Sequence, residues 1–309
     1  MPLQLENILS LQDTIQNAFE TLVAAAEQGA DRATQIKAEL RVVNAAQQVE
    51  ATLLTPTDRV LRLAHLPTVN TATKVAQLLD IFSILQEEMT IEELAESTGA
   101  DPVLLVRIMR CLTAYNIFAQ TRADQFKATH LSRKLAEGPA GSFFKLAYDI
   151  SHEMHRGIPA ALLRTGFKNP RDSLGSGAVK AWGKSIFEHI AEDPTKVAVF
   201  GLAMEVHGEL EPEYYADFPF SEITEELSKK PNAITIVDVA GGRGHVLRDI
   251  IQENPQLPGR FILQDLHEVV QEVQKQDTPF EAMVQDIFQP QTLKGEQISF
   301  IVLIEGLAL

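Results

Sequence analysis

The chain has 309 residues, 45% of them apolar and 22% charged, a composition that is typical of globular proteins and excludes global disorder. Its 42 acidic and 27 basic side chains give a formal charge of −15, which disfavours nonspecific binding to nucleic acid or to an anionic membrane surface. The single cysteine, Cys111, excludes an internal disulfide framework and a cysteine-rich zinc site, and we expect no metal centre.

The sequence carries no targeting or membrane signal that we recognise. The first residues lack the basic and apolar stretches of a secretory signal. No apolar run approaches the roughly 20 residues that cross a bilayer. We therefore expect a cytoplasmic protein without a membrane partner.

The first half of the chain is predicted to be almost entirely helical. One helix face is predicted from apolar residues at three- and four-residue steps, namely Ile8, Leu11, Ile15, Phe19, Leu22 and Ala26. This face is too apolar to stand alone, and the pattern leaves open whether it packs on its own domain or on another subunit. A second helix is predicted from Gly29 towards Val49, and Thr55 to Asp58 is typical of the N-cap of a third.

A winged-helix pattern follows between residues 90 and 135. Thr90 to Glu93 has the form of a capping box, and Asp101-Pro102 begins the next helix. Two short strands flank residues 122–125 and predict a hairpin. Arg107 and Arg110 on the second helix are weak support for DNA binding on a chain of this charge, so we expect no nucleic-acid partner. Residues 1–135 are interpreted as a helical and winged-helix domain.

The pattern changes at Pro231. Residues 136–230 are predicted to be a mainly helical linker and covering region. Beyond them, short apolar strands alternate with helices, and the strands are expected at 234–240, 261–264, 282–284 and 298–304. Such alternation predicts a parallel sheet covered by helices, so residues 231–309 are interpreted as a partial α/β domain of Rossmann-like type.

The turn after the first of these strands is rich in glycine. Gly241, Gly242 and Gly244 remove Cβ atoms where the backbone turns tightly and a ligand can approach closely. Asp265 and Asp286 follow the next two strands, and the carboxyl ends of parallel strands are where such sheets bind ligands. Asp238, within the first strand, suits a cationic ligand better than a pyrophosphate, which favours S-adenosylmethionine over a dinucleotide.

Three segments, in order along the chain, resemble the plant and fungal small-molecule O-methyltransferases that use S-adenosylmethionine. Val237 to Gly244 is similar to their first motif, Gln264 to Val270 to their ribose-binding segment, and Gln285 to Phe288 to their adenine-side motif. Upstream, Leu162 to Pro170 and Phe200 to Met204 are similar to family segments that close over the substrate. The winged-helix region is similar to the family's dimerisation domain, which implies a homodimer.

The resemblance implies a role for each cofactor residue. Asp238 and the three glycines would hold the methionine part, and Asp265 would bind the ribose. Leu266 would cover the adenine, and Asp286 with Ile287 would flank its ring. The implied substrate is a small aromatic or polyketide-type metabolite.

The chain departs from the family at its general base. The family's histidine, in a His-Asp-Trp segment, falls by alignment at Gly306-Leu307-Ala308, so we expect the base to be absent and the C-terminus to be shortened relative to the family. Weaker candidates for proton transfer remain in His152, His155 and Glu305. Phe200 and Met204 are expected in the wall of a substrate pocket.

Three functions stay open at this point. The first is methyl transfer to an oxygen of a small metabolite. The second is a non-methylating enzyme on the same scaffold that binds S-adenosylmethionine and catalyses dehydration or pericyclic closure, for which loss of the histidine is expected. The third is an inactive partner that dimerises through its helical N-terminus.

Overall fold

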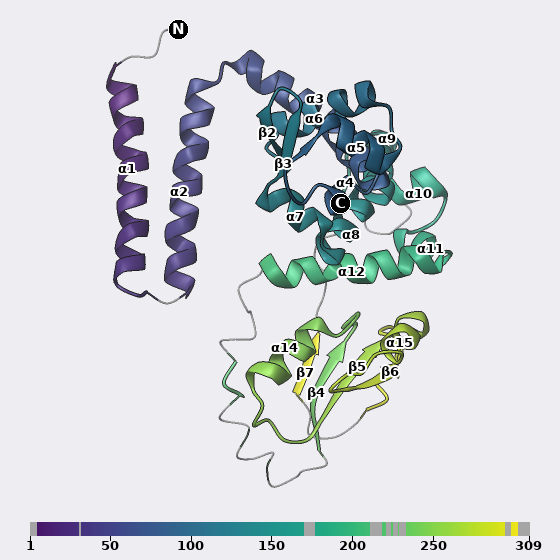
Figure 1. The fold of residues 1–309 in the computed structure, drawn as a ribbon. Helices are drawn as coiled ribbons and strands as arrows, with labels where there is room; N and C mark the ends of the chain where they lie inside the picture. Colours follow the sequence, from purple (N-terminus) through teal and green to yellow (C-terminus); the bar gives the residue numbers. More distant parts are fainter. Residues whose placement is uncertain are drawn as a thin grey trace. The chain divides into compact units, whose positions relative to one another are not determined.

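The computed structural model of the chain describes residues 5–30, 32–169, 177–210, 218–220, 224, 228, 233–293 and 298–301 (Figure 1). The chain divides into two compact units, residues 1–69 and 70–309, which are treated separately below.

The first unit contains a helical hairpin. It is formed by α1 (Leu5–Glu27) and α2 (Arg32–Leu53), which pack against each other, and α3 (Pro56–Leu78) begins after them. The predicted N-cap of α3 is confirmed, because Asp58 N–H donates to Thr55 Oγ1 at 3.1 Å. The apolar face predicted for α1, whose partner the sequence left open, is not the face that packs most closely on α2. The buried seam of the hairpin consists of Ala18, Ala25, Ala38 and Ala45, whereas Ile8 and Phe19 are about half exposed. Small side chains allow two helices to approach closely, so the alanines form the contact and the larger apolar groups lie beside it.

The second unit begins with the predicted winged helix. Its elements are α4 (Ile81–Ile84), β1 (Met89–Thr90), α5 (Ile91–Thr98), α6 (Pro102–Ala114), β2 (Phe118–Arg122), β3 (Gln125–Ala128) and α7 (His130–Ala136). The three strands form an antiparallel sheet in the order β1-β3-β2. Both predicted caps are confirmed, since Glu93 N–H donates to Thr90 Oγ1 at 3.2 Å and Leu104 N–H donates to Asp101 Oδ1 at 3.0 Å.

A helical layer follows. Its elements are α8 (Gly138–Leu146), the π-helical turn η1 (Ala147–Ser151), α9 (His152–Thr165), α10 (Gly177–Trp182), α11 (Ile186–Ala191) and α12 (Pro194–Leu210). Its core is a cluster of buried side chains that includes Ile150, Met154, Ala203 and Met204. α9 and α10 approach closely at Gly177, where a Cβ atom would lie 2.2 Å from Met154 O.

Within the described residues, the α/β part has four parallel strands. Its elements are β4 (Ile234–Val239), α14 (His245–Glu253), β5 (Arg260–Asp265), α15 (His267–Val273), β6 (Glu281–Val284) and β7 (Ile298–Ile301). The strand order is β6-β5-β4-β7, with Val237 opposite both Ile262 and Ser299. The predicted strands are confirmed, except that 302–304 lie outside the described residues. The fold class expected from the sequence, a helical and winged-helix region followed by a Rossmann-like α/β domain, is therefore confirmed.

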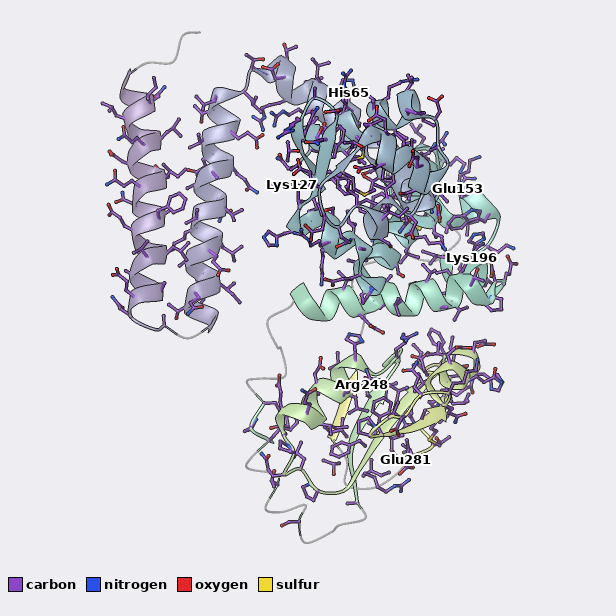
Figure 2. All side chains as sticks on the ribbon, viewed as in Figure 1. His65, Lys127, Glu153, Lys196, Arg248 and Glu281 are labelled. Carbon is purple, nitrogen blue, oxygen red and sulfur yellow. The ribbon has the colours of Figure 1, made fainter. Side chains whose placement is uncertain are left out.

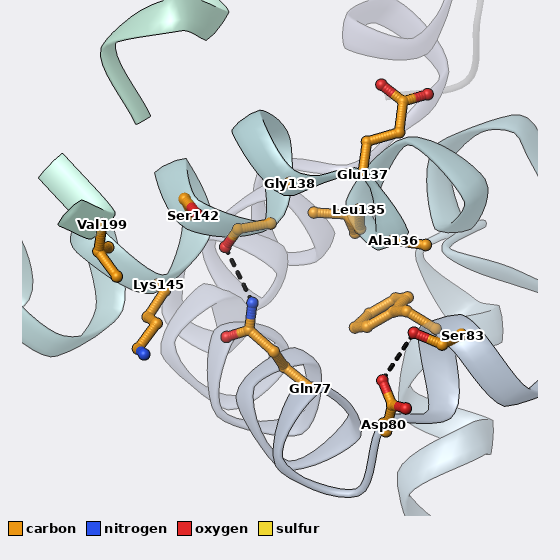
Figure 3. A pocket seen from close by; sticks show the side chains of 12 residues that line it. Gln77, Asp80, Ser83, Leu135, Ala136, Glu137, Gly138, Ser142, Lys145 and Val199 are labelled. Carbon is orange, nitrogen blue, oxygen red and sulfur yellow. Dashed lines mark hydrogen bonds between the residues drawn. The ribbon is translucent and has the colours of Figure 1, made fainter. Parts of the chain in front are cut away.

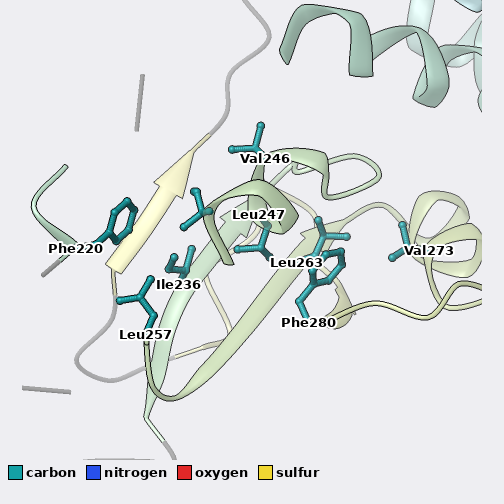
Figure 4. Close-up of a cluster of buried hydrophobic side chains, with 9 residues drawn as sticks. Phe220, Ile236, Val246, Leu247, Leu257, Leu263, Val273 and Phe280 are labelled. Carbon is teal, nitrogen blue, oxygen red and sulfur yellow. The ribbon is translucent and has the colours of Figure 1, made fainter. Parts of the chain in front are cut away.

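Two features hold this sheet together. One face of it packs on a core that includes Ile236, Leu247, Leu263 and Phe280 (Figure 4). At the amino ends of the strands, the Arg260 guanidinium donates to the two carboxylate oxygens of Glu281 at 2.7 and 2.6 Å. Glu281 is labelled in Figure 2. The candidate cofactor-binding residues lie at the opposite, carboxyl ends of the strands and in the loops that follow them.

Candidate functional site

The glycine-rich turn after β4 has a backbone that few side chains tolerate. Gly242 and Gly244 have φ values of 57° and 73°, in the left-handed region, and Ala240 shares that region at 61°. A Cβ atom at Gly241 would lie 2.3 Å from Asp238 Oδ2, and one at Gly244 would lie 2.4 Å from Phe280 Cζ. The glycines therefore permit both the turn and its close approach to the strand.

Asp238 is the polar centre of this turn. Its side chain lies in β4 and is only 2% exposed. Within the described part of the chain, neither carboxylate oxygen has a hydrogen-bond partner. Burial, and secondarily the charge of Asp265, raises the pKa of Asp238 from 3.8 to about 7. A buried carboxylate without a partner fits a ligand that brings a cationic donor, such as an ammonium group.

Asp265 lies beside the turn, although it is 23 residues away from Gly242 in sequence. Gly242 N–H donates to its Oδ2 at 2.8 Å, and Leu266 N–H donates to its Oδ1 at 2.7 Å. Burial raises the pKa of Asp265, and these two hydrogen bonds oppose that rise. Each oxygen keeps a lone pair, so the carboxylate can still accept from the paired hydroxyls of a ribose.

The third acid, Asp286, lies on the loop after β6. Its Oδ1 accepts from Phe288 N–H at 2.9 Å, and Gln285 N–H donates to Asp265 O at 2.9 Å, which links this loop to the ribose-side segment. Leu266 and Ile287 are about half exposed, and Phe288 is 88% exposed. Exposed apolar side chains next to an acceptor suit a flat heteroaromatic ring with an exocyclic amine. The structure thus brings Asp238, the glycines, Asp265, Leu266, Asp286 and Ile287 to one edge of the sheet.

A residue that the sequence analysis gave no role in this site connects the turn to α12. Arg243 Nε lies 2.7 Å from Glu205 Oε1, and both side chains are about three-quarters buried. Gly201 on α12 makes room for the arginine, since a Cβ atom there would lie 3.0 Å from Arg243 Cδ. An arginine in a glycine-rich turn is the only sequence signal for this link.

The two predicted pocket-wall residues lie on α12. Met204 is buried in the core of the helical layer. Phe200 is partly buried and packs edge-to-face on Phe187, with ring centroids 6.0 Å apart. Their role towards a substrate stays a prediction.

The candidates for proton transfer are placed unevenly. His152 follows the π-helical turn η1 and is partly buried, with Nε2 3.3 Å from Asn70 Nδ2 and its ring 5.4 Å from that of Tyr148. His155 is exposed on α9. Glu305 lies outside the described residues. Their catalytic role likewise stays a prediction.

A separate hollow of about 250 Å³ lies among the end of α3, α4, α7, α8 and α12 (Figure 3). Gln77 Nε2 donates to Gly141 O there at 2.9 Å. None of the site residues predicted from the sequence lines it.

The described residues contain neither a cluster of metal-ligating side chains nor a membrane-spanning helix. No three His, Cys, Asp or Glu side chains in this part of the chain gather as they would around a metal ion. No helix within the same ranges is long and apolar enough to cross a membrane.

Comparison with known proteins identifies the relatives of the chain. Residues 61–138 match the profile of the O-methyltransferase dimerisation domain. Over 269 residues the chain is 30% identical to O-methyltransferase ucdC of Aspergillus ustus, an alignment that covers 84% of this chain and 69% of that protein.

Solved structures with similar folds include two of particular interest. One is described as a pericyclic reaction enzyme, with a TM-score of 0.76 and 22% identity over 94% of this chain and 74% of that one. The other is OxaC in complex with SAH and oxaline, with a TM-score of 0.75 and 22% identity over 94% of this chain and 75% of that one. At this identity the likeness establishes the fold.

Proposed function

The chain belongs to the O-methyltransferase family, and from that premise we propose that it binds S-adenosylmethionine at the carboxyl edge of β4, β5 and β6 and methylates an oxygen of a small aromatic or polyketide-type metabolite. The observation that carries the proposal is Asp238, a buried carboxylate that has no partner among the described residues and lies beside a glycine-rich turn. The SAH bound in OxaC supports the same assignment by analogy of fold.

The residues at the carboxyl ends of these strands contact different parts of the cofactor in this proposal. Asp238 accepts from the ammonium group of the methionine part, and the glycine turn leaves room for it. Asp265 accepts from the ribose hydroxyls, while Leu266 and Ile287 cover the adenine. When bound, the cofactor supplies an electrophilic methyl group on a sulfonium. The chain's own contribution is to orient it and to neutralise its ammonium charge.

Binding of S-adenosylhomocysteine, measured by calorimetry, tests the cofactor assignment. We expect wild-type protein to bind, and Asp238→Asn to bind about tenfold or more weakly, because a charge-assisted hydrogen bond is lost. Asp277→Asn, which removes an exposed carboxylate from the same domain, is the matched control and should bind like wild type. Wild-type protein that does not bind would overturn the assignment.

A second function on the same scaffold is favoured by one observation. The sequence has Gly306-Leu307-Ala308 where the family's catalytic histidine is expected, and the fold is similar to that of a pericyclic reaction enzyme. A reaction in which no substrate hydroxyl has to lose its proton does not need a catalytic base, so it is compatible with this replacement. Transfer of tritium from methyl-labelled cofactor to a panel of phenols separates the two functions: labelled product supports methylation, and cofactor binding without transfer supports the alternative.

We also propose a homodimer that forms through the N-terminal part of the chain. The match to a dimerisation domain supports it. So do Leu63, Leu78 and Val103, apolar side chains within the matched range that are each about 70% exposed. Sedimentation equilibrium should give twice the mass of the chain, and Val103→Glu should shift the protein towards monomer.

A further inference from the structure

Gln264 is an unusual residue for the middle of a parallel sheet. It lies in β5, and its polar side chain is fully buried. A buried amide is stable only when its donors and acceptor are paired. The partner that pairs it comes from a loop that the sequence analysis did not connect with this strand.

The partner of Gln264 is Gln291, and the two amides bind each other reciprocally. Gln264 Nε2 donates to Gln291 Oε1 at 2.9 Å, and Gln291 Nε2 donates to Gln264 Oε1 at 2.7 Å. Gln291 Oε1 also accepts from Leu293 N–H at 3.0 Å. The far end of the loop that carries Asp286 and Ile287 is therefore fastened to β5.

The near end of the same loop is fastened to β5 by the main chain of Gln285, whose N–H donates to Asp265 O at 2.9 Å, and the Gln285 side chain braces the loop from within. This buried side chain donates to Asp286 O at 2.8 Å and accepts from Thr292 Oγ1 at 3.0 Å. Between the two fastenings the loop exposes Ile287 and Phe288, so apolar packing does little to hold it. Hydrogen bonds to buried amides are what fix its position.

The main chain of Gln264 contacts the opposite side of the proposed cofactor site, the glycine turn. Its carbonyl oxygen accepts from Ala240 N–H at 2.7 Å, which holds the start of the glycine turn. The next residue, Asp265, accepts from Gly242 N–H through its carboxylate. One dipeptide thus touches the turn on one side and the loop after β6 on the other.

We propose that Gln264, through its amide pair with Gln291, is a positioning residue that fixes the adenine side of the proposed cofactor site relative to the carboxylate of Asp265. The inference rests on the proposed cofactor site. It predicts that loss of the pair weakens binding of the nucleoside part of the ligand, whereas loss of Asp238 weakens binding of the amino-acid part alone.

The first experiment measures, by calorimetry, the binding of two ligands, adenosine and S-adenosylhomocysteine. Gln291→Leu removes both hydrogen bonds between the two amides and leaves the Gln264 amide only the contact of Nε2 with Met283 Sδ at 3.6 Å. We expect this variant to bind both ligands about tenfold more weakly. Asp238→Asn should bind S-adenosylhomocysteine more weakly than wild type but adenosine with the same affinity. Gln276→Leu, an exposed glutamine in the same domain, is the matched control. If wild-type protein binds both ligands and Gln291→Leu binds them equally well, the inference fails alone. If wild-type protein binds neither, the inference and the proposed function fail together.

A second variant separates positioning from simple stability. In Gln264→Leu with Gln291→Leu, two apolar side chains replace the pair and no buried amide is left unpaired, so the urea midpoint should recover relative to Gln291→Leu. The weaker adenosine binding should persist, because the loop is no longer fastened. Recovery of adenosine affinity together with the midpoint would mean that the pair only stabilises the fold, and would overturn the inference.

Discussion

The buried carboxylate of Asp238 leads to a prediction about stability in the absence of ligand. In the folded protein its pKa is about 7, against 3.8 when it is exposed. Between these values the unfolded chain has released the proton while the folded chain retains it. The unfolded state then binds fewer protons, so the free energy of unfolding falls as pH rises from about 4 to about 7 and is level, for this group, above that.

The size of this effect follows from the two pKa values. The rise from 3.8 to about 7 corresponds to about 4 kcal/mol of destabilisation once Asp238 is ionised. Asp238→Asn does not titrate and keeps a neutral amide in the same place. We subtract the free energy of unfolding of wild type from that of the variant. This difference should increase between pH 4 and pH 8, by an amount that approaches about 4 kcal/mol.

Urea unfolding at several pH values between 4 and 8 measures this difference in the free energy of unfolding. The proteins compared are wild type, Asp238→Asn and the control Asp277→Asn. Because the other titrating groups are shared, the difference between wild type and Asp238→Asn reports this carboxyl together with its coupling to Asp265. A difference that is constant across the range, or that grows towards low pH, would refute the claim that burial holds Asp238 protonated.

Three further predictions concern the same turn. Affinity for S-adenosylhomocysteine should fall about tenfold per pH unit as the pH is lowered from about 7 to about 5, because binding requires Asp238 to lose its proton. Calorimetry in two buffers of different ionisation enthalpy should detect the released proton. An affinity that does not change with pH would contradict this prediction. Ala240→Gly should raise the free energy of unfolding by about 1 kcal/mol, since it relieves a left-handed backbone at a φ of 61°. Gly244→Ala should lower it by about 3 kcal/mol in the same urea assay, because the added methyl group meets the ring of Phe280 at a left-handed position. Equal stability of either variant and wild type would count against the turn geometry.

The sequence allowed good prediction where local chemistry decides the structure. Thr90 and Asp101 begin helices as predicted because a hydroxyl or carboxylate caps free amides within three residues. The convergence of Asp238, Asp265 and Asp286 followed from the rule that parallel strands bring their carboxyl ends to one edge.

Long-range pairing was beyond the sequence. Gln264 and Gln291 are both common surface residues, and nothing local indicates that one is fully buried and paired with the other. The partner of the apolar face of α1 stayed open for a related reason. Helical periodicity identifies an apolar arc, but the close contact with α2 uses Ala18 and Ala25, which lie beside that arc.

The alanine seam between α1 and α2 has a thermodynamic consequence. Methyl groups remove little apolar surface from water compared with the side chains of Ile8 or Phe19, so the hairpin alone gains little free energy from burial. Helices in proteins draw most of their stability from packing, so α1 and α2 have little to stabilise them when the hairpin stands alone. Association that covers the larger side chains is then coupled to helix formation, and by mass action the ellipticity of residues 5–53 should rise with protein concentration.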